Sequence, residues 1–459
     1  MTQHETQHTD VVVIGLGPGG ETAAGRLLEA GLDVVGIERE LVGGECPYWG
    51  CVPSKMIVRA AGTVSEAHRV DQLAGTATVR PDVAPVARRI RAEATDGWDD
   101  TVAVERFEKL GGRFVRGSAR IEGPGRVRVG DQVFTAGRGV VLATGSRPVT
   151  PPIPGLDTVA SWTNREAVAA EVVPPSLVVL GGGAIGLELA QAFARFGSSV
   201  TVIEAAEHVL PAEEPEVGDL LAEVLRAEGV DLRLGRRAVW VSDGADGPVV
   251  DLDDGTRAEG TRLLVAVGRR PALDGLGLEH YDIDPPGRGV PVDEQLRAAD
   301  GLWAIGDVTG VGAFTHLAVY QAEVAAADIL GHQGTGADYA ALARVTFTDP
   351  EVGSVGLSEE AARARGLDVA TGVAPVAASS RGFIHGPGNA GLVKLVADRA
   401  TGALVGATAA GPVGGEVLSM LTLAVHAGIP VDDLRRMHYA YPTFHRGVLD
   451  ALAGLPAGR

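Results

Sequence analysis

Two segments in which a glycine-rich turn joins an apolar strand to a helix restrict this chain to few folds. The first consists of an apolar strand over 11–14, a helix predicted over 21–30 and a second strand over 34–38. Its turn reads Gly15-Leu16-Gly17-Pro18-Gly19-Gly20. This order of elements predicts a β-α-β unit of the kind that binds dinucleotides.

A second unit of the same kind has strands over 177–180 and 200–204 and a helix predicted over 187–196. Glu38 lies 18 residues after Gly20, and Glu204 lies 18 residues after Gly186. The dinucleotide fingerprint places its acid at about 20 residues. The second turn reads Gly181-Gly182-Gly183-Ala184-Ile185-Gly186. We therefore expect two dinucleotide sites and a relay of electrons between them.

Three glycines of the first turn each have a separate structural role. Gly15 permits the tight turn, Gly17 lets the backbone approach a pyrophosphate, and Gly20 lets the helix pack closely on the strand. The helix N-terminus offers N–H groups to the phosphates, and Glu38 is expected to accept hydrogen bonds from ribose hydroxyls. One such motif can equally be an ordinary glycine turn, but the flanking strand, helix and acid favour a site.

Glu204 bears on the choice between the two nicotinamide dinucleotides. A carboxylate at this place pairs with a free 2′-hydroxyl and repels a 2′-phosphate. Residues 205–208 contain no arginine that would hold such a phosphate. NADH is therefore expected over NADPH, unless another loop supplies a cation.

Charge and length exclude several classes of partner. The 459 residues carry a formal net charge of −19, which disfavours nucleic acid or an anionic membrane as partner. No apolar run approaches the roughly 18 residues of a membrane span, and segment 1–10 resembles no targeting peptide. We expect a soluble cytoplasmic protein of several domains, with proline-rich seams at 147–155 and near 267–271.

The chain has only two cysteines, Cys46 and Cys51. A regular helix would separate them by about 7.5 Å along its axis, whereas a disulfide needs Cα atoms within about 4.4–6.8 Å. The segment must therefore be irregular, which Pro47 and Gly50 favour. The pair is expected to form a reversible disulfide beside a redox cofactor, with a helix N-terminus or Lys55 stabilising a thiolate.

Three other interpretations of the cysteines compete. A structural disulfide that closes so short a loop stabilises the fold little and is unusual in the cytosol. A zinc site needs about four ligands, and no second cysteine pair exists. Two unrelated buried thiols would not explain the absence of every other cysteine. No metal site is expected.

The chain resembles the flavin-dependent pyridine nucleotide–disulfide oxidoreductases, which include dihydrolipoamide dehydrogenase, glutathione reductase and mercuric reductase. The resemblance covers nearly the whole chain. It implies an α/β fold with two Rossmann-like dinucleotide-binding domains, for FAD and NAD, and a C-terminal α+β dimerisation domain in a homodimer. The segments that carry it are 43–55, 143–148, 304–307 and 348–356. The implied parts are an FAD domain over 1–150, an NAD(P) domain over 151–270, a return to the FAD domain over 271–343 and a dimerisation domain over 344–459.

The resemblance also implies roles for single residues. Cys51 would be the flavin-side thiol and Cys46 the thiol that attacks a substrate disulfide. Lys55 would lie near the flavin with Glu188 as its partner, although Glu188 read alone is an ordinary solvated helix acid. FAD is expected against Gly15, Gly17, Gly19, Gly20, Glu38, Arg39, Gly44, Lys55, Ala119, Thr144, Gly145, Ser146, Gly306, Asp307 and Ala318. NAD is expected against Gly181, Gly183, Ala184, Ile185, Gly186, Glu204 and Gly268.

The C-terminal segment departs from the family pattern. In its disulfide reductases, a His and a Glu in this segment, supplied by the other subunit, act as acid–base for the thiols. Tyr441 stands in place of the His and Arg446 in place of the Glu. Tyrosine, with a pKa of about 10, is a poor base near neutral pH. His445 and His438 are nearby in sequence and are candidates to substitute for it. Segment 455–459 lacks the paired cysteines of mercuric reductases.

Three functions are consistent with these residues. The first is an NADH-dependent, FAD-containing reductase of a small disulfide, similar to dihydrolipoamide dehydrogenase. The second is a reductase that passes electrons to a quinone or metal acceptor, which the loss of the His–Glu pair favours. The third is a flavin-bearing sensor or a subunit of a larger complex, which two intact nucleotide motifs disfavour.

Overall fold

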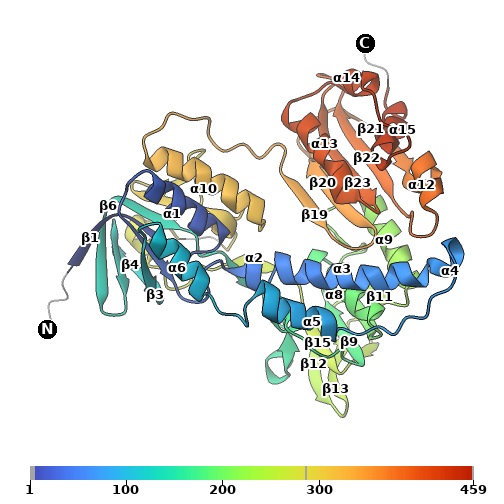
Figure 1. Cartoon of the computed structure of the whole chain (residues 1–459), viewed down its shortest axis with the longest axis horizontal. Helices are drawn as coiled ribbons and strands as arrows, with labels where there is room; N and C mark the ends of the chain where they lie inside the picture. The colour runs from blue at the N-terminus through green and yellow to red at the C-terminus, as the bar shows by residue number, and fades with distance from the viewer. Residues whose placement is uncertain (1–5, 285–286, 457–459) are drawn as a thin grey trace. The chain divides into compact units, whose positions relative to one another are not determined.

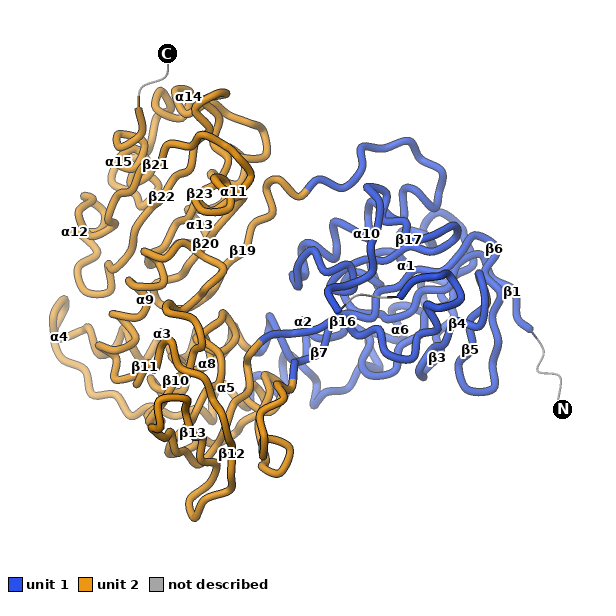
Figure 2. The backbone as a smooth tube through the Cα atoms, turned by 180° about the vertical axis from the view of Figure 1, so that it is seen from behind, with its two compact units in different colours: residues 1–53, 88–149, 268–338 blue, residues 54–87, 150–267, 339–459 orange. Residues whose placement is uncertain are grey.

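The computed structural model of the chain describes residues 6–284 and 287–456. The expectations for segments 1–10 and 455–459 therefore fall partly outside the described residues. The described chain divides into two compact units (Figure 2). Unit 1 comprises residues 1–53, 88–149 and 268–338, and unit 2 comprises residues 54–87, 150–267 and 339–459.

The main sheet of unit 1 is parallel through four neighbouring strand pairs (Figure 1). Its strand order is β17-β18-β6-β1-β2-β3, and β4 and β5 extend it from β6. The strands are β1 (Thr6–Ile14), β2 (Val34–Glu38), β3 (Arg113–Arg116), β4 (Ala119–Gly123), β5 (Arg126–Val129), β6 (Gln132–Leu142), β17 (Arg297–Ala299) and β18 (Leu302–Ala304).

Alternate residues of β1 serve two cores because successive strand side chains point to opposite faces. Val11 and Val13 pack with the helices α1 (Pro18–Glu29), α6 (Thr101–Lys109) and α10 (Thr315–Ile329). Val12 and Ile14 pack with side chains of β4, β5 and β6. Burial on both faces explains why these strands are continuous apolar runs.

Several predicted boundaries differ from the structure. The helix predicted over 187–196 is α8 (Ala184–Arg195). Helix α1 begins at Pro18 rather than at residue 21, because proline at the first helical position has its φ already set and lacks only an N–H that would have no partner there. The run 302–307 also predicts a strand that ends on Asp307, but β18 ends at Ala304. Gly306 adopts φ 75, which ends the strand, and Asp307 lies in the 3-10 turn η4 (Gly306–Thr309).

The redox segment, residues 43–55 with both cysteines, includes parts of two helices rather than one. Helix α2 (Glu45–Tyr48) ends before Trp49, and helix α3 (Cys51–His68) begins at Cys51. A Cβ at Gly50 would lie 3.1 Å from the Glu45 carbonyl oxygen, so glycine permits the close turn between them. The predicted irregularity between the cysteines is confirmed.

Unit 2 contains a parallel five-stranded sheet in the order β11-β10-β9-β15-β8. A three-stranded antiparallel sheet β12-β13-β14 joins its core. The elements are β8 (Ser161–Trp162), α7 (Asn164–Val168), β9 (Ser176–Leu180), α8 (Ala184–Arg195), β10 (Ser199–Glu204), α9 (Pro215–Ala227), β11 (Asp231–Leu234), β12 (Ala238–Gly244), β13 (Gly247–Leu252), β14 (Arg257–Glu259) and β15 (Arg262–Val265).

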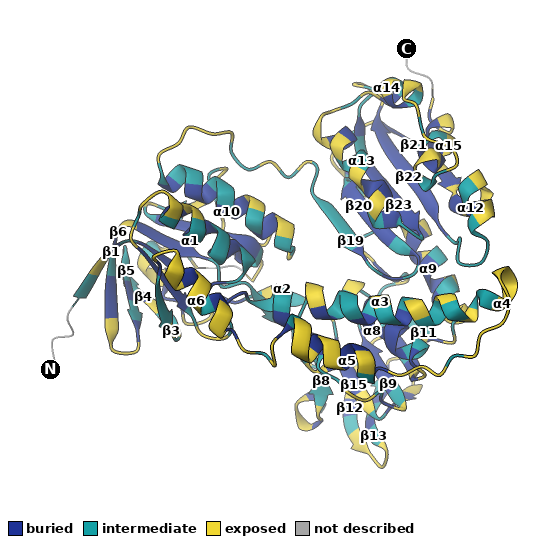
Figure 3. Ribbon diagram, viewed as in Figure 1, coloured by how far each residue is buried: buried dark blue, intermediate teal, exposed yellow. Residues whose placement is uncertain are grey.

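The C-terminal part of unit 2 is an antiparallel sheet in the order β19-β20-β23-β22-β21. Strand β22 is buried along its whole length (Figure 3). Helices α13 and α15 share its core. The elements are β19 (Ala343–Thr346), β20 (Glu351–Gly356), α11 (Glu359–Ala364), β21 (Val369–Pro375), α12 (Ser380–His385), β22 (Leu392–Asp398), β23 (Leu404–Gly411), α13 (Gly414–His426), α14 (Val431–Arg436) and α15 (Gly447–Ala453).

On either side of residues 150–267, the chain leaves and re-enters unit 1 through a two-stranded ribbon of β7 (Ser146–Pro148) and β16 (Arg269–Pro271). The unit boundaries at 149/150 and 267/268 lie near the two proline seams. Residues 54–87 group with unit 2, and residues 150–267 group with 339–459. The four-part division predicted from the sequence stays a prediction. Among the described residues, no helix is both long and apolar enough to cross a membrane.

Candidate functional site

The two glycine turns have closely matching geometry. Gly15 and Gly181 adopt φ of 95 and 108. A Cβ on Gly15 would lie 2.4 Å from the carbonyl oxygen of Ala143, and one on Gly181 would lie 2.5 Å from that of Ala266. Each turn therefore requires glycine at its first position, both for its backbone conformation and for its close approach to a neighbouring strand end.

The later glycines of the two turns also correspond. A Cβ on Gly20 would lie 1.9 Å from the carbonyl oxygen of Gly15, and one on Gly186 would lie 2.1 Å from that of Gly181. By contrast, a Cβ on Gly183 would meet no atom of the described residues within 4 Å. The third glycine of each turn thus allows helix and strand to pack, while Gly183 borders open space that a phosphate can approach.

The two acids that follow the turns are held in the same way. Glu38 accepts a hydrogen bond from the Leu16 N–H at 2.9 Å and one from the Glu40 N–H at 2.8 Å. Glu204 accepts one from the Gly182 N–H at 2.6 Å. The Ala206 N–H also donates to Glu204 at 2.8 Å. In both units the carboxylate is fixed between the glycine turn and the residue two places beyond it.

These features fit two bound dinucleotides. Helices α1 and α8 both begin with no side chain of the described residues capping them. Their first N–H groups and their helix dipoles are suited to phosphate. The oriented carboxylates retain lone pairs for ribose hydroxyls, because a carboxylate can accept about four hydrogen bonds.

Asp307 belongs to a polar network in unit 1. The Ser146 hydroxyl donates to its carboxylate at 2.5 Å. Arg269 donates to the Ser146 hydroxyl and to the Ser146 carbonyl, both at 2.8 Å, and lies 3.4 Å from the Glu45 carboxylate. Burial raises the pKa of Asp307, while the Ser146 hydrogen bond and the Arg269 charge lower it in part. The network thus holds the Asp307 carboxylate beside Ser146, the first residue of β7.

The other residues expected at FAD lie at turns and element ends of unit 1, except Lys55. Gly19 packs on Ala318 in α10, since a Cβ would lie 3.1 Å from the Ala318 carbonyl oxygen. Gly306 donates its N–H to the buried Gln321 side chain at 2.6 Å. Arg39 is an exposed side chain near Glu40. The remaining positions are Gly17, Gly44, Ala119, Thr144 and Gly145.

The residues expected at NAD centre on the second turn. Ala184 and Ile185 are the first two residues of α8, and Glu204 ends β10. Gly268 adopts φ 126 and accepts a hydrogen bond from the Val149 N–H at 3.0 Å. Gly268 lies in unit 1, whereas the turn lies in unit 2.

Cys46 lies in α2 and Cys51 is the first residue of α3; both are thiols in the structure. The Cys51 sulfur lies 3.4 Å from the Thr315 hydroxyl, at the start of α10. The hydrogen bond shared with the Cys51 thiol, together with burial, raises the pKa of Cys46. Cys51 occupies a helix N-terminus, a position that favours a thiolate.

Lys55 and Glu188 form an ion pair in unit 2, with Nζ and Oε2 2.7 Å apart. The Glu188 side chain is only 6% exposed, so it is not a solvated helix acid. The Phe347 N–H donates to the other carboxylate oxygen at 2.9 Å, and the Phe347 ring centroid lies 4.8 Å from the Lys55 ammonium. The partnership expected between Lys55 and Glu188 is thus present, while their role in the reaction stays a prediction.

The C-terminal residues considered for acid–base catalysis, Tyr441 and His445, are exposed, as is Arg446. Tyr441 is 67% exposed. The guanidinium of Arg446 lies 5.6 Å from the Tyr441 ring centroid. His445 lies in the 3-10 turn η6 (Phe444–Arg446). The roles predicted for Tyr441 and His445 stay predictions.

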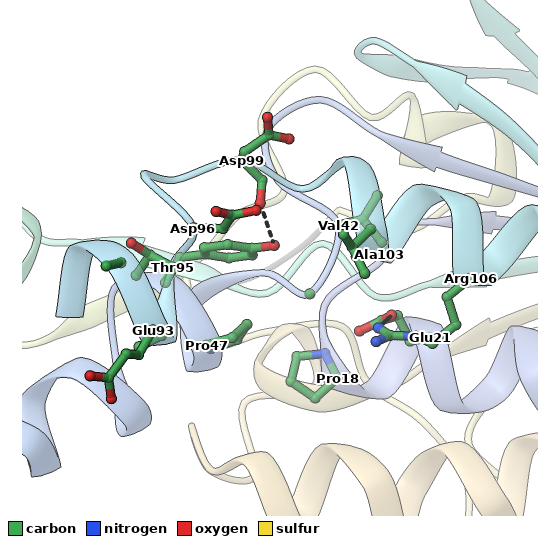
Figure 4. A pocket seen from close by; sticks show the side chains of 15 residues that line it. Pro18, Glu21, Val42, Pro47, Glu93, Thr95, Asp96, Asp99, Ala103 and Arg106 are labelled. Carbon is green, nitrogen blue, oxygen red and sulfur yellow. Dashed lines mark hydrogen bonds and ion pairs between the residues drawn. The ribbon is translucent and has the colours of Figure 1, made fainter. Parts of the chain in front are cut away.

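A pocket of about 520 Å³ lies within unit 1 beside the redox segment (Figure 4). Its walls come from the start of α1, from Val42, Gly43, Pro47 and Tyr48, from residues 92–96 and Asp99, and from α6. Neither cysteine lines it. In the pocket, Glu21 pairs with Arg106 at 2.7 Å, and burial raises the pKa of Glu21.

Sequence reasoning missed two residues that hold candidate site residues. Phe347 contacts Glu188 and Lys55 in unit 2, and Arg269 contacts Ser146 in unit 1, in each case between segments far apart in the chain. Their only sequence signal is a place near a motif, close to Asp349-Pro350 and to Gly268 respectively. Thr315 begins the stretch 315–318, which the family resemblance implies would lie by the flavin.

Comparison with known proteins identifies the class. Residues 9–322 match the pyridine nucleotide-disulphide oxidoreductase family, and residues 342–452 match the dimerisation domain of that family. The chain belongs to this family. The family, the fold class and the enzyme class predicted from the sequence are confirmed.

Individual relatives span the whole chain. Dihydrolipoyl dehydrogenase of Halobacterium salinarum is 36% identical, covering 96% of this chain and 95% of that protein. Dihydrolipoyl dehydrogenase of Thermus scotoductus is 35% identical, covering 97% of each. Among solved structures, the HOCl-induced flavoprotein disulfide reductase RclA of Escherichia coli has a TM-score of 0.85 at 28% identity, covering 97% of this chain and 99% of that one. LpdA of Mycobacterium tuberculosis has a TM-score of 0.86 at 27% identity, covering 98% and 100%.

The chain is therefore an FAD-dependent oxidoreductase that uses a pyridine nucleotide and acts in disulfide chemistry. The names of the relatives do not favour the alternative of a quinone or metal reductase.

Proposed function

We propose that this enzyme is an NADH-dependent reductase of a small disulfide, of the dihydrolipoamide type, and that it works as a homodimer in the cytoplasm. The observation that carries the proposal is the placement of Cys46 and Cys51 on either side of a helix break, with Cys51 at the start of α3. The dimerisation-domain match supports a homodimer. A reversible cysteine pair fits a reducing compartment.

Bound FAD and NADH would supply hydride transfer and two-electron storage, which amino-acid side chains lack. The glycine turns and the acids Glu38 and Glu204 would hold the two dinucleotides. Ser146 and Asp307 would bind polar groups of the flavin nucleotide, and the Lys55–Glu188 pair would orient the reacting rings. We assign the remaining FAD and NAD positions as the family resemblance does.

The two thiols would have different roles in the reaction. Two electrons and two protons convert the Cys46–Cys51 disulfide into two thiols. The hydrogen bond with Cys51 and burial raise the pKa of Cys46, so the Cys46 thiol holds its proton more tightly than an ordinary thiol does. Cys46 must therefore lose its proton to a base before it attacks a substrate disulfide.

We propose His445 as that base, with Tyr441 lining the approach, because the family positions for the base and its acid are Tyr441 and Arg446 here. Replacing His445 with Gln should lower disulfide reduction at least tenfold. Electron transfer from NADH to ferricyanide should not change. The same substitution at His438 serves as the matched control, and equal effects of both would contradict the assignment.

Acceptor preference tests the function as a whole. The Cys46→Ser variant should lose lipoamide reduction almost completely while retaining NADH oxidation with a quinone acceptor. Wild-type enzyme that reduces quinones but no disulfide would contradict the proposal and support the quinone reductase instead.

The NADH preference rests on the oriented Glu204 carboxylate. We expect kcat/KM for NADH to exceed that for NADPH at least tenfold. Replacing Glu204 with Gln removes the charge that repels a 2′-phosphate, so the ratio should fall about tenfold. An unchanged ratio would mean that Glu204 does not face the ribose.

A further inference from the structure

Trp98 contacts the loop between the two cysteines at two adjacent residues. A short helix leaves its last carbonyls without partners inside the helix, and α2 ends at Tyr48. The indole N–H of Trp98 donates to the Tyr48 carbonyl oxygen at 3.3 Å. The Trp98 ring stacks on Trp49, with centroids 5.3 Å apart and planes 18° apart. Trp98 therefore holds both backbone and side chain inside the loop.

Neighbours of Trp98 secure the same segment at other points. The Asp100 carboxylate accepts the Val42 N–H at 2.7 Å, just before the redox segment. The Tyr48 hydroxyl donates to the Asp99 carbonyl at 3.4 Å, the bond drawn as a dashed line to Asp99 in Figure 4. We call residues 95–100 the clamp segment. It contacts the chain both before Cys46 and between the cysteines.

The backbone of the clamp segment adopts a costly conformation to make these contacts. Asp96, Gly97 and Trp98 have φ of 48, 68 and 63 in succession. Among the described residues, Trp98 is the only aromatic residue with positive φ, a conformation that is rare for bulky side chains. Such strain persists where surrounding contacts over-determine it, and it concentrates at functional sites. The π-helical turn η1 (Ile90–Ala94) directly precedes the segment, and such turns also occur at functional sites.

We propose that Trp98 is a positioning residue that holds residues 47–50 in one conformation and thereby lowers the redox potential of the Cys46–Cys51 couple. This inference rests on the redox roles proposed above for the two cysteines. It deepens that proposal by assigning control of the couple to a residue outside the motif.

The physical reason is effective concentration. A disulfide requires the two Cα atoms within about 4.4–6.8 Å. When two electrons and two protons break the S–S bond, no covalent link holds the loop. A loop kept in place presents each thiol to the other at high effective concentration, which favours re-formation of the disulfide. Without the clamp the dithiol gains conformational freedom, so the disulfide becomes easier to reduce.

The test is a redox titration of the FAD-loaded enzyme in dithiothreitol buffers, with Cys46 and Cys51 quantified by alkylation and mass spectrometry. Trp98→Ala should favour the dithiol about tenfold, which equals about 30 mV toward positive potential. Trp98→Phe keeps a ring to stack but loses the indole donor, so it should shift the equilibrium about threefold. Trp240→Phe is the matched control, because Trp240 is half exposed on β12, and it should titrate as wild type.

The outcomes are distinct. A Trp98→Ala enzyme within twofold of wild type would overturn the inference while leaving the proposed function intact. If Trp98→Ala does not retain FAD, Trp98→Phe decides: a shift of about threefold supports the inference, and no shift overturns it. Wild-type enzyme in which neither cysteine changes its alkylation across the titration would overturn both the inference and the proposed function.

Discussion

At the scale of single residues, Glu188 combines deep burial with two different partners. Its carboxylate pairs with Lys55 on one oxygen and accepts the Phe347 N–H on the other. A buried carboxylate is tolerated only when its hydrogen bonds and its charge are satisfied. The ammonium of Lys55 also lies over the Phe347 ring, so three groups fix one another.

Glu188→Gln tests whether this charge matters for the reaction. The amide keeps an acceptor for Phe347 but cannot neutralise Lys55, so we expect kcat to fall about tenfold to a hundredfold. The free energy of unfolding should fall by no more than about 1–2 kcal/mol. Stopped-flow measurement of NADH oxidation and urea denaturation separate the two effects.

The matched control is Glu223→Gln, which removes an exposed acid from helix α9. It should change neither quantity. Equal kcat in wild type and Glu188→Gln would show that the pair only supports the fold.

Asp307 yields a pH prediction. Burial raises its pKa in the folded protein, so the folded state binds this proton more tightly than the unfolded state does. Its contribution to stability is therefore present below the ordinary aspartate pKa and is lost as pH rises through the raised folded value. Asp307→Asn, which is neutral at every pH, should remove this loss.

Apoprotein stability measured from pH 4 to 7 should thus decline more in wild type than in Asp307→Asn. The variant should also bind FAD at least tenfold more weakly, as isothermal titration would show. Parallel stability curves would contradict the origin given for the pKa shift.

At the scale of elements, Lys394 links three parts of unit 2. It lies on β22 with 3% side-chain exposure and pairs with Glu214, Glu216 and Glu359 at 2.9, 2.8 and 3.1 Å. Glu214 and Glu216 flank the start of α9, and Glu359 begins α11. Burial alone would lower the pKa of Lys394, but the three carboxylates outweigh it and raise the pKa.

Lys394→Met should therefore destabilise the protein by about 3–5 kcal/mol, because it leaves the buried Glu214 carboxylate without a cation. The raised folded pKa means that this stabilisation is fully present below the ordinary lysine pKa and is lost only as pH rises beyond it. Chemical denaturation at pH 7 measures the effect. Adding Glu214→Gln to the variant should recover part of the loss; no recovery would contradict the charge argument.

The sequence predicts elements well where the fold reuses a local pattern. Strand β2 ends on Glu38 as expected, and the helix break falls between Cys46 and Cys51. Prediction fails where a backbone conformation or distant contact decides. Helix α1 starts early because of Pro18, and no local pattern reveals that Trp98 adopts positive φ and reaches Trp49.

At the scale of the whole molecule, chain length and the two proline-rich seams indicate several domains. They do not indicate which segments of the chain group into one compact unit. Residues 54–87 follow the redox motif directly, yet they belong to unit 2. Phe347, in the C-terminal part, contacts Glu188 in the nucleotide-binding part. Contacts across more than a hundred residues leave no periodic signal, so the sequence indicates the pairing of Lys55 with Glu188 only through family resemblance.

The central claim is that electrons from NADH reach the Cys46–Cys51 couple. The most direct measurement is an anaerobic NADH titration of the FAD-loaded enzyme, with each cysteine alkylated and identified by mass spectrometry. The account predicts that two alkylated cysteines per chain appear, at Cys46 and Cys51, as NADH is consumed. Bleaching of the flavin colour without any new reactive thiol would contradict it.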